Sequence, residues 1–181
     1  MTSREVVKKA ILFQNPDRMP YNLAPQYGTD FYFAGISPSP DDRPSSGIDE
    51  WGALWENIGV CKLGEVKNSP IKDWSDLNKI KIPDVEDEKR WQCLEGIREK
   101  ASDKFLIGRG ISLYERVHFI RGLENTWGDI YENPEKLGDL IDILVNMNLK
   151  IIPRYAKLGF DGYFFPDDCC LLYTSPSPRD S

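Results

Sequence analysis

Charged side chains follow two apolar runs in the second half of the chain. KFLIGRG contains Arg109, the helical segment SLYERVHFIRG after it carries Glu115 and Arg116, and FDGYFFPDD ends in Asp167 and Asp168. Arginines bind carboxylates through paired hydrogen bonds, and carboxylates can bind polar groups of a substrate or a backbone amide. The two aspartates could instead cap a loop, and the arginines could simply pair with Glu115 and Glu124. The spacing is compatible with either role.

The elements around these residues predict that they share one edge of a sheet. Both apolar runs have the length of a short strand, and the segment between them has helical periodicity. Asn133 and Pro134 suit the start of a helix that runs to Leu158, and Gly159 suits its end. Parallel strands joined by helices bring the residues beyond their carboxyl ends to the same edge. We therefore expect the charged residues to lie there.

The first hundred residues predict a helix, a strand, a long loop, a hairpin and a second helix. SREVVKKAILF predicts a helix capped by Ser3, and MPYNLAP (residues 19–25) predicts the first strand. Residues 28–47 are aromatic at first and then rich in Pro, Ser and Asp, which predicts a long loop. Residues 84–101 have apolar side chains at helical spacing and charges elsewhere, which predicts an amphipathic helix.

The hairpin predicted over residues 48–66 contributes two further candidates, Asp49 and Trp51. IDEWGAL alternates in polarity, NIG suits a turn, and VCKLGEV suits the returning strand. Trp51 and Trp55 fall on one face, where they could line a planar ligand or anchor the core. Asp49 could reach a site from the hairpin or cap a turn, and in a strand its neighbour Glu50 would point to the opposite face.

Composition disfavours several classes of partner. The formal net charge of −6 over 181 residues disfavours nucleic acid and anionic membrane surfaces. No apolar run is long enough to span a bilayer, and the charged N-terminal segment lacks the apolar stretch of a signal peptide, so we expect a cytoplasmic protein. Cys61 and Cys93 lack CxxC spacing, and His118 has no clustered zinc ligands around it in the sequence. We expect reduced thiols, a packed or surface histidine, and no metal site.

The end of the sequence differs in character from the rest. CLLYTSPSPRDS has no periodicity and resembles the translation of a sequencing adaptor. We therefore interpret residues 1–168 as the domain and residues 169–181 as a non-native tail. A genuine Ser/Pro-rich tail is the alternative.

Five segments, in this order, resemble the N-terminal half of uroporphyrinogen decarboxylase superfamily proteins, whose fold is a TIM barrel. They are NPDRMP, IDEWGALW, GRGISLYERVHFIRGLEN, NPEKLGDLID and LGFDGYFFPDD. The GRG segment does not fit a dinucleotide-binding fingerprint, because GxGxxG requires glycine where the chain has Leu113. The resemblance implies an α/β fold, namely a truncated (β/α)8 barrel with roughly the first four βα units and a β-hairpin insertion.

The resemblance implies two alternative activities for the parent protein. A decarboxylase of tetrapyrrole acetate groups needs no cofactor and uses arginines and a carboxylate at its substrate. The divergent branch that DEWG and YERVHFIRGLEN resemble also contains corrinoid-dependent methyltransferases, which use zinc to activate a thiol and work with a corrinoid partner. Their zinc ligands come from the second half of the barrel. Our candidate assignment takes Asp167, Asp168 and Arg116 as catalytic and places Arg109, Asp49, Trp51 and Glu115 at the substrate.

The chain departs from the family pattern in one segment, and the resemblance also implies how the isolated chain behaves. In decarboxylases of the family an arginine-rich loop follows the first strand. With that strand at residues 19–25, this chain has no arginine after Arg18 until Arg43. A TIM barrel needs ~250 residues to close, so a half barrel exposes two strand edges. We expect the chain by itself to be inactive and to associate, or to be a half barrel that forms a homodimer.

Overall fold

The computed structural model describes residues 1–59 and 64–167, in two compact units. Unit 1 holds residues 1–42, 84–111 and 146–165, and unit 2 holds residues 43–59, 64–83, 112–145 and 166–167. The predicted tail, residues 169–181, lies outside the described residues, as do Cys61 and Asp168.

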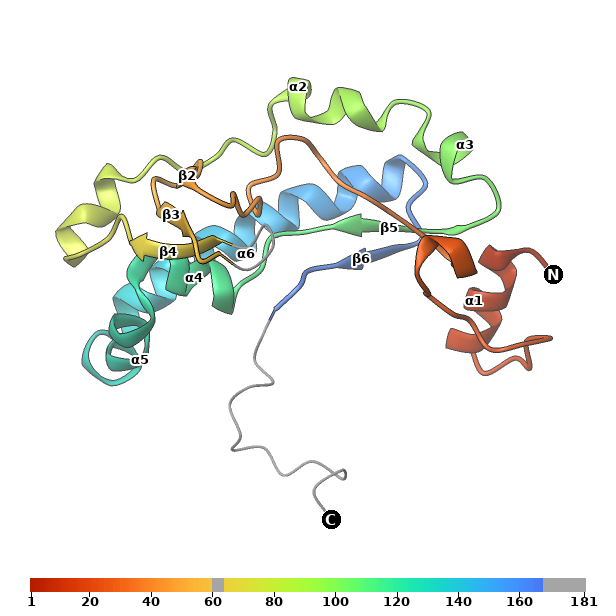
Figure 1. Cartoon of the computed structure of the whole chain (residues 1–181), viewed down its shortest axis with the longest axis horizontal. Helices are drawn as coiled ribbons and strands as arrows, with labels where there is room; N and C mark the ends of the chain where they lie inside the picture. Colours follow the sequence, from red (N-terminus) through yellow and green to blue (C-terminus); the bar gives the residue numbers. More distant parts are fainter. Residues whose placement is uncertain (60–63, 168–181) are drawn as a thin grey trace, which may run out of the picture. The chain divides into compact units, whose positions relative to one another are not determined.

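The described residues form six α-helices, three short 3-10 helices and six strands (Figure 1). The α-helices are α1 (Ser3–Ile11), α2 (Glu88–Trp91), α3 (Ile97–Ala101), α4 (Tyr114–Arg121), α5 (Leu123–Glu132) and α6 (Pro134–Lys157). The 3-10 helices are η1 (Pro25–Tyr27), η2 (Trp74–Lys79) and η3 (Gln92–Leu94). The strands are β1 (Phe31–Ala34), β2 (Gly47–Ile48), β3 (Leu54–Asn57), β4 (Gly64–Asn68), β5 (Phe105–Arg109) and β6 (Gly162–Phe164).

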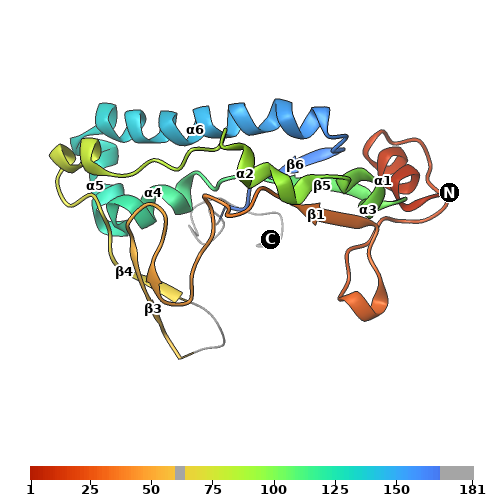
Figure 2. The same cartoon turned by 90° about the horizontal axis from the view of Figure 1, so that it is seen from above.

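Unit 1 contains a parallel sheet in the order β1-β5-β6 (Figure 2). Phe31 is in register with Phe105, and Ile107 with Gly162. The prediction of parallel strands in KFLIGRG and FDGYFFPDD is confirmed. Three parallel strands are described, where four were expected, and the described part of the chain closes no barrel.

The first strand of this sheet was predicted in the wrong place. Residues 19–25 make an isolated bridge from Asn22 to Thr29, and β1 lies in the segment that was predicted to be a loop. Pro20 and Pro25 lack the backbone N–H that a strand ladder needs, whereas the FYFA run of β1 is rich in aromatic residues, which favour strands. Residues 35–46 therefore follow the first strand, and this shift matters for the site.

Two tyrosines explain why glycines lie at the carboxyl end of β5. Tyr155 of α6 is 2% exposed, and its hydroxyl donates to the Arg109 carbonyl (3.0 Å) and accepts from the Ile36 amide (3.1 Å). A Cβ on Gly108 would overlap the Tyr155 ring, and a Cβ on Gly110 would overlap the Tyr163 hydroxyl. The two glycines in GRG therefore admit aromatic packing against the strand.

A buried carboxylate holds the amino end of β6. Asp161, whose side chain is 2% exposed, accepts hydrogen bonds from Arg4 (2.8 Å), Arg98 (2.9 Å) and the Leu106 amide (3.1 Å). Burial by itself raises the pKa of Asp161, but the hydrogen bonds from Arg4 and Leu106 lower it below its ordinary value. These contacts connect α1, α3, β5 and β6 before the first residue of β6.

A second buried carboxylate holds the segment before β1. Arg18 donates to both oxygens of Asp30 at 2.6 and 2.5 Å, and the Tyr21 amide donates to the same carboxylate at 3.0 Å. The hydrogen bonds from Arg18 lower the pKa of Asp30 well below its ordinary value. In the NPDRMP segment, Arg18 therefore has a structural partner.

Unit 2 contains an antiparallel sheet in the order β2-β3-β4. The returning hairpin β3–β4 agrees with the prediction, although residues 60–63 are not described. The continuous strand predicted over residues 48–54 is wrong. A turn closes there, with hydrogen bonds from the Gly52 amide to the Asp49 carbonyl (3.1 Å) and from the Asp49 amide to the Ala53 carbonyl (3.0 Å). Gly52 has φ +94°, which a residue with a side chain rarely adopts.

Helix boundaries follow local capping and glycine. The long helix α6 and its stop at Gly159 (φ +79°) are confirmed. Thr2, and not Ser3, caps α1, because its side chain forms a capping box with Glu5. The single helix predicted over residues 84–101 is wrong, since it is divided into α2, η3 and α3, with Gly96 at φ +63° before α3. Its apolar spacing was nevertheless correct, because Trp91, Leu94 and Ile97 are buried.

Candidate functional site

A buried ion pair joins Asp49 to α4 in unit 2. Arg116 donates to the Asp49 carboxylate at 2.9 Å, and the two side chains are 0% and 3% exposed. The same carboxylate accepts from the amides of Trp51 (3.0 Å) and Ala53 (2.9 Å) and from the Trp55 indole (3.0 Å). The alternative that Asp49 caps a turn is therefore the one observed. Because Asp49 lies in that turn, Asp49 and Glu50 do not point to opposite faces of a strand as the alternation predicted.

The two tryptophans of the hairpin belong to the core of unit 2. Trp51 is 1% exposed and Trp55 is 3% exposed. The Trp55 ring meets the Phe119 ring edge-on with centroids 4.8 Å apart. Of the two interpretations, ligand-lining or core, the burial favours core for both residues.

Asp167 holds the beginning of α4. Its carboxylate accepts from the amides of Leu113 (3.0 Å), Tyr114 (2.8 Å) and Glu115 (2.9 Å). These amides have no partner within the helix, and a carboxylate there also interacts favourably with the helix dipole. Of the roles that the sequence left open for Asp167, the binding of backbone amides is the one observed, and it connects residue 167 to the first turn of α4.

Glu115 pairs with an arginine that the candidate assignment omitted. Arg43 donates to both Glu115 oxygens, at 2.8 and 2.6 Å. The Arg43 guanidinium lies 5.2 Å from the centroid of the Phe119 ring, and the Arg116 guanidinium lies 5.4 Å from it. For Arg116 the sequence left open a carboxylate-binding role or a pairing with Glu115 or Glu124, and the structure pairs it with Asp49. One sequence signal pointed to Arg43: it is the only arginine between Arg18 and Arg90.

His118 lies on α4, close in sequence to Glu115 and Arg116. Burial lowers the pKa of His118 below its ordinary value, and the Glu115 carboxylate opposes that shift only in part. Its ring packs against Tyr114 and Phe119, with centroids 5.3 and 4.4 Å apart. The Nδ1 atom is buried and has no hydrogen-bond partner among the residues that the structure describes. His118 is thus a half-buried histidine packed between rings, as the sequence suggested.

Two sequence candidates do not join this cluster. Arg109 belongs to unit 1, where its side chain is exposed and its guanidinium lies 5.9 Å from the centroid of the Phe33 ring. Asp168 lies outside the described residues. The cluster that the structure brings together consists of Arg43, Asp49, Glu115, Arg116, His118 and Asp167, which we call the α4 cluster.

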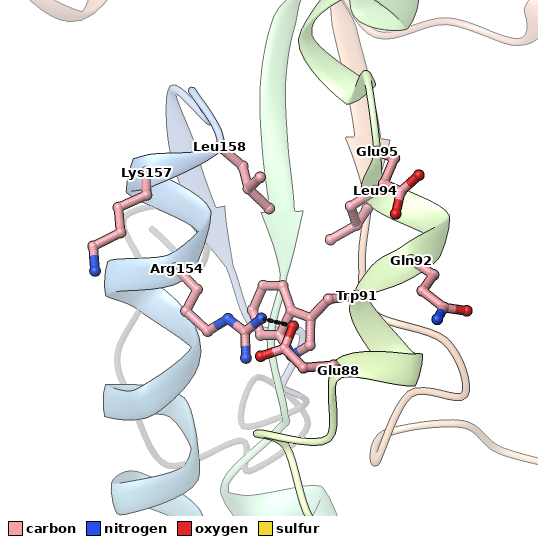
Figure 3. Close-up of a pocket in the computed structure, with 8 residues that line it drawn as sticks. All are labelled: Glu88, Trp91, Gln92, Leu94, Glu95, Arg154, Lys157 and Leu158. Atoms are coloured by element: carbon pink, nitrogen blue, oxygen red, sulfur yellow. Dashed lines mark hydrogen bonds and ion pairs between the residues drawn. The ribbon is translucent and has the colours of Figure 1, made fainter.

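Each unit has a surface hollow among its described residues. In unit 1 a hollow of about 660 Å³ opens between α2–η3 and the end of α6, where Arg154 lies over Trp91 (4.0 Å) and pairs with Glu88 (2.8 Å) (Figure 3). In unit 2 a hollow of about 460 Å³ is lined by Asp49, Trp51, Lys79 and their neighbours. Each hollow mixes acidic and basic side chains, so neither has a clear preference for the charge of a ligand.

The described residues do not supply a metal site. Over residues 1–59 and 64–167, no three His, Cys, Asp or Glu side chains gather in a way that could hold an ion. The same residues contain no helix long and apolar enough to cross a membrane. The side chains of the α4 cluster can themselves bind a carboxylate through arginine and transfer protons through carboxyl or imidazole groups.

The chain was also compared with known proteins. No family model, no curated protein and no solved structure matches it.

Proposed function

We propose that the chain forms the first part of a (β/α)8 barrel related to the uroporphyrinogen decarboxylases, and that the parent protein is a cytoplasmic lyase. Its substrate would be a tetrapyrrole or a related carboxylated small molecule. The strand order supports the proposal, because the strands of the parallel sheet, β1, β5 and β6, lie side by side in the order in which they occur along the chain, with β2–β4 of the other sheet between β1 and β5 in sequence. A barrel has this order, whereas a flavodoxin-like sheet does not. A classic dinucleotide-binding sheet can begin in the same way, but the chain lacks that fingerprint.

The observation that carries the proposal is the position of Asp167. It lies in the loop after β6 and binds the first amides of α4, which follows β5. Loops beyond the carboxyl ends of neighbouring parallel strands build the active site in TIM-barrel enzymes. Asp167 thus acts as a positioning residue, and Asp168 beside it remains the proposed catalytic carboxylate.

The corrected position of β1 supplies the arginine that the proposal needs. The loop after the first strand now begins at Gly35, and Arg43 follows within it. We assign the binding of a substrate carboxylate to Arg43, because Arg116 is fully buried and already held by Asp49. The ion pair between Arg116 and Asp49 fixes the hairpin turn against α4. It thereby helps to position the part of α4 that Arg43 contacts.

A corrinoid-dependent methyltransferase is the second candidate. The DEWG and YERVHFIRGLEN segments favour it, since they resemble the divergent branch that contains these enzymes. The described residues do not fit a zinc ion, so no step is assigned to a metal. A His-x-Cys pair followed by a distant Cys in the parent protein would favour methyl transfer, and their absence would favour decarboxylation.

The test is made on the parent protein. The genomic reading frame beyond residue 167 is determined, and the protein that it encodes is expressed. It is incubated anaerobically with uroporphyrinogen III, and the porphyrins are separated after oxidation; a parallel reaction contains methylcobalamin and a thiol. We expect stepwise loss of substrate carboxylates, with turnover lowered by Arg43→Gln, Asp167→Asn and Asp168→Asn. If all three variants keep wild-type turnover, the site assignment is wrong, and if neither reaction occurs, the proposed function is wrong.

A further inference from the structure

The two ion pairs of α4 differ in what a ligand can reach. The side chains of Arg116 and Asp49 are 0% and 3% exposed, whereas those of Arg43 and Glu115 are 34% and 14% exposed. Separating a buried pair leaves charge without solvation in the core. A partly exposed pair can separate at small cost, since water hydrates both groups. The Arg43–Glu115 pair is therefore the one that can exchange partners.

The ion pair between Arg43 and Glu115 has the two-bond geometry with which an arginine binds any carboxylate. Two hydrogen bonds, at 2.8 and 2.6 Å, join the guanidinium of Arg43 to the carboxylate of Glu115. The Phe119 ring lies beside the guanidinium at 5.2 Å and restricts its orientation. On the other side of the pair, Asp167 holds the Glu115 amide and so fixes the first turn of α4. The fork of Arg43 is thus already oriented for a carboxylate.

We propose that the Glu115 carboxylate is an internal stand-in, which occupies Arg43 until a ligand carboxylate displaces it. The inference rests on the proposed function for the class of ligand, a polycarboxylate. It gives Glu115 a role opposite to that of a substrate-binding residue, because its charge competes with the ligand. When the ligand displaces it, the Glu115 side chain rotates towards the solvent and the α4 backbone stays in place.

The experiment measures the reaction of Arg43 with phenylglyoxal, a guanidine-specific reagent, by peptide mass spectrometry on the 181-residue chain. Tricarballylate serves as a flexible tricarboxylate, and uroporphyrin III serves as a stable tetrapyrrole polycarboxylate. We expect Glu115→Gln to speed labelling of Arg43 and to lower the tricarballylate concentration that gives half protection by about two- to fivefold, the range measured for exposed ion pairs. Glu65→Gln, which breaks the exposed Glu65–Lys67 pair (2.7 Å) in the same unit, should change neither quantity.

Folding is followed in the same digest. Arg121 is 8% exposed and pairs with Asp129, so it reacts quickly only if the protein unfolds. If Glu115→Gln exposes Arg121, the comparison is made with Glu115→Asp, which keeps the charge on a shorter side chain and should also weaken the pair.

The outcomes separate this inference from the proposed function. Tighter protection of the Glu115 variant by both ligands supports both proposals. Tighter protection of the Glu115 variant by tricarballylate, with no protection by uroporphyrin, supports the stand-in and contradicts a tetrapyrrole substrate. Equal half-protection of wild type and variant, or no protection of Arg43 in either, overturns the stand-in. Equal protection of the two proteins by uroporphyrin leaves the proposed substrate class supported.

Discussion

Four carboxylates in the described residues each have their own set of donors, and these donors decide the role of each carboxylate. Asp161 and Asp30 hold the amino-end side of the parallel sheet, whereas Asp49 and Asp167 organise the α4 cluster. A buried carboxylate without donors would cost several kcal/mol, so its partners must be present when the protein folds. Within the α4 cluster, the Arg43–Glu115 pair is the more exposed of the two ion pairs, and a ligand would engage it.

The lowered pKa of Asp30 predicts how the free energy of unfolding depends on pH. The hydrogen bonds from Arg18 depress its pKa in the folded state below the ordinary value of 3.8. Its contribution to stability is therefore fully present above that value and is lost as the pH falls towards the folded pKa. We expect Asp30→Asn to be less stable than wild type at pH 6 and the difference to shrink below about pH 4.

Urea unfolding followed by circular dichroism between pH 6 and pH 2 measures this effect. Asp139→Asn, on an exposed position of α6, is the matched control and should follow wild type throughout. A constant stability difference between Asp30→Asn and wild type over the whole range would contradict the prediction.

At the scale of elements, close packing of tyrosines against β5 determines which residues the strand can contain. Tyr155 ties the end of β5 to the segment after β1, and Asn148 accepts from the Ile111 amide (2.9 Å) and from the Tyr163 hydroxyl. Gly108 and Gly110 lie under these two rings. Closely spaced glycines after a strand often form a phosphate-binding loop. In this chain Gly108 and Gly110 instead make room for the two tyrosine rings.

Gly108→Ala should destabilise the protein by about 1–3 kcal/mol, because the new methyl group overlaps a ring that cannot move without losing two hydrogen bonds. Gly138→Ala is the control. No atom lies within 4 Å of the added Cβ, and the position is inside α6, so this variant should gain about 0.5–1 kcal/mol. Thermal unfolding measures both changes. Equal stability of the two variants would show that the contact with Tyr155 does not limit the strand.

At the scale of the whole molecule, the open parallel sheet has consequences for association. Among the described residues, β1 and β6 each pair with β5 and have no second neighbour. Phe164 and Phe165, at the end of β6, are 48% and 47% exposed. Unpaired strand edges beside exposed aromatic residues are common sites of association.

We therefore expect the 181-residue chain to elute from gel filtration as a dimer or larger species, or to aggregate. A charged substitution at the edge, Phe164→Lys, should shift the distribution towards monomer. Phe13→Lys, which changes a more exposed phenylalanine (93% exposed) in the loop after α1, is the control. A monodisperse wild-type monomer with a cooperative thermal transition would contradict this expectation and the truncated-barrel proposal with it.

The sequence by itself determined the elements whose signals are local. The helix from Pro134 and its stop at Gly159, the strands around Phe105 and Gly162, and the buried spacing of Trp91, Leu94 and Ile97 followed from capping, glycine and periodicity. The placement of β1 failed because a short aromatic run after prolines has the same local features in a loop and in a strand. What makes this run a strand is its pairing with β5, which is a long-range interaction.

The partners within the candidate site were decided by tertiary structure alone. The sequence identified Asp49, Glu115, Arg116 and Asp167 as chemically capable, but it missed Arg43 and did not identify Asp49 as the partner of Arg116. Arg43 and Glu115 are 72 residues apart, and Arg116 and Asp49 are 67 residues apart. Residue type fixes which groups can form an ion pair, but which groups meet depends on how the hairpin, α4 and the loop after β6 fold together.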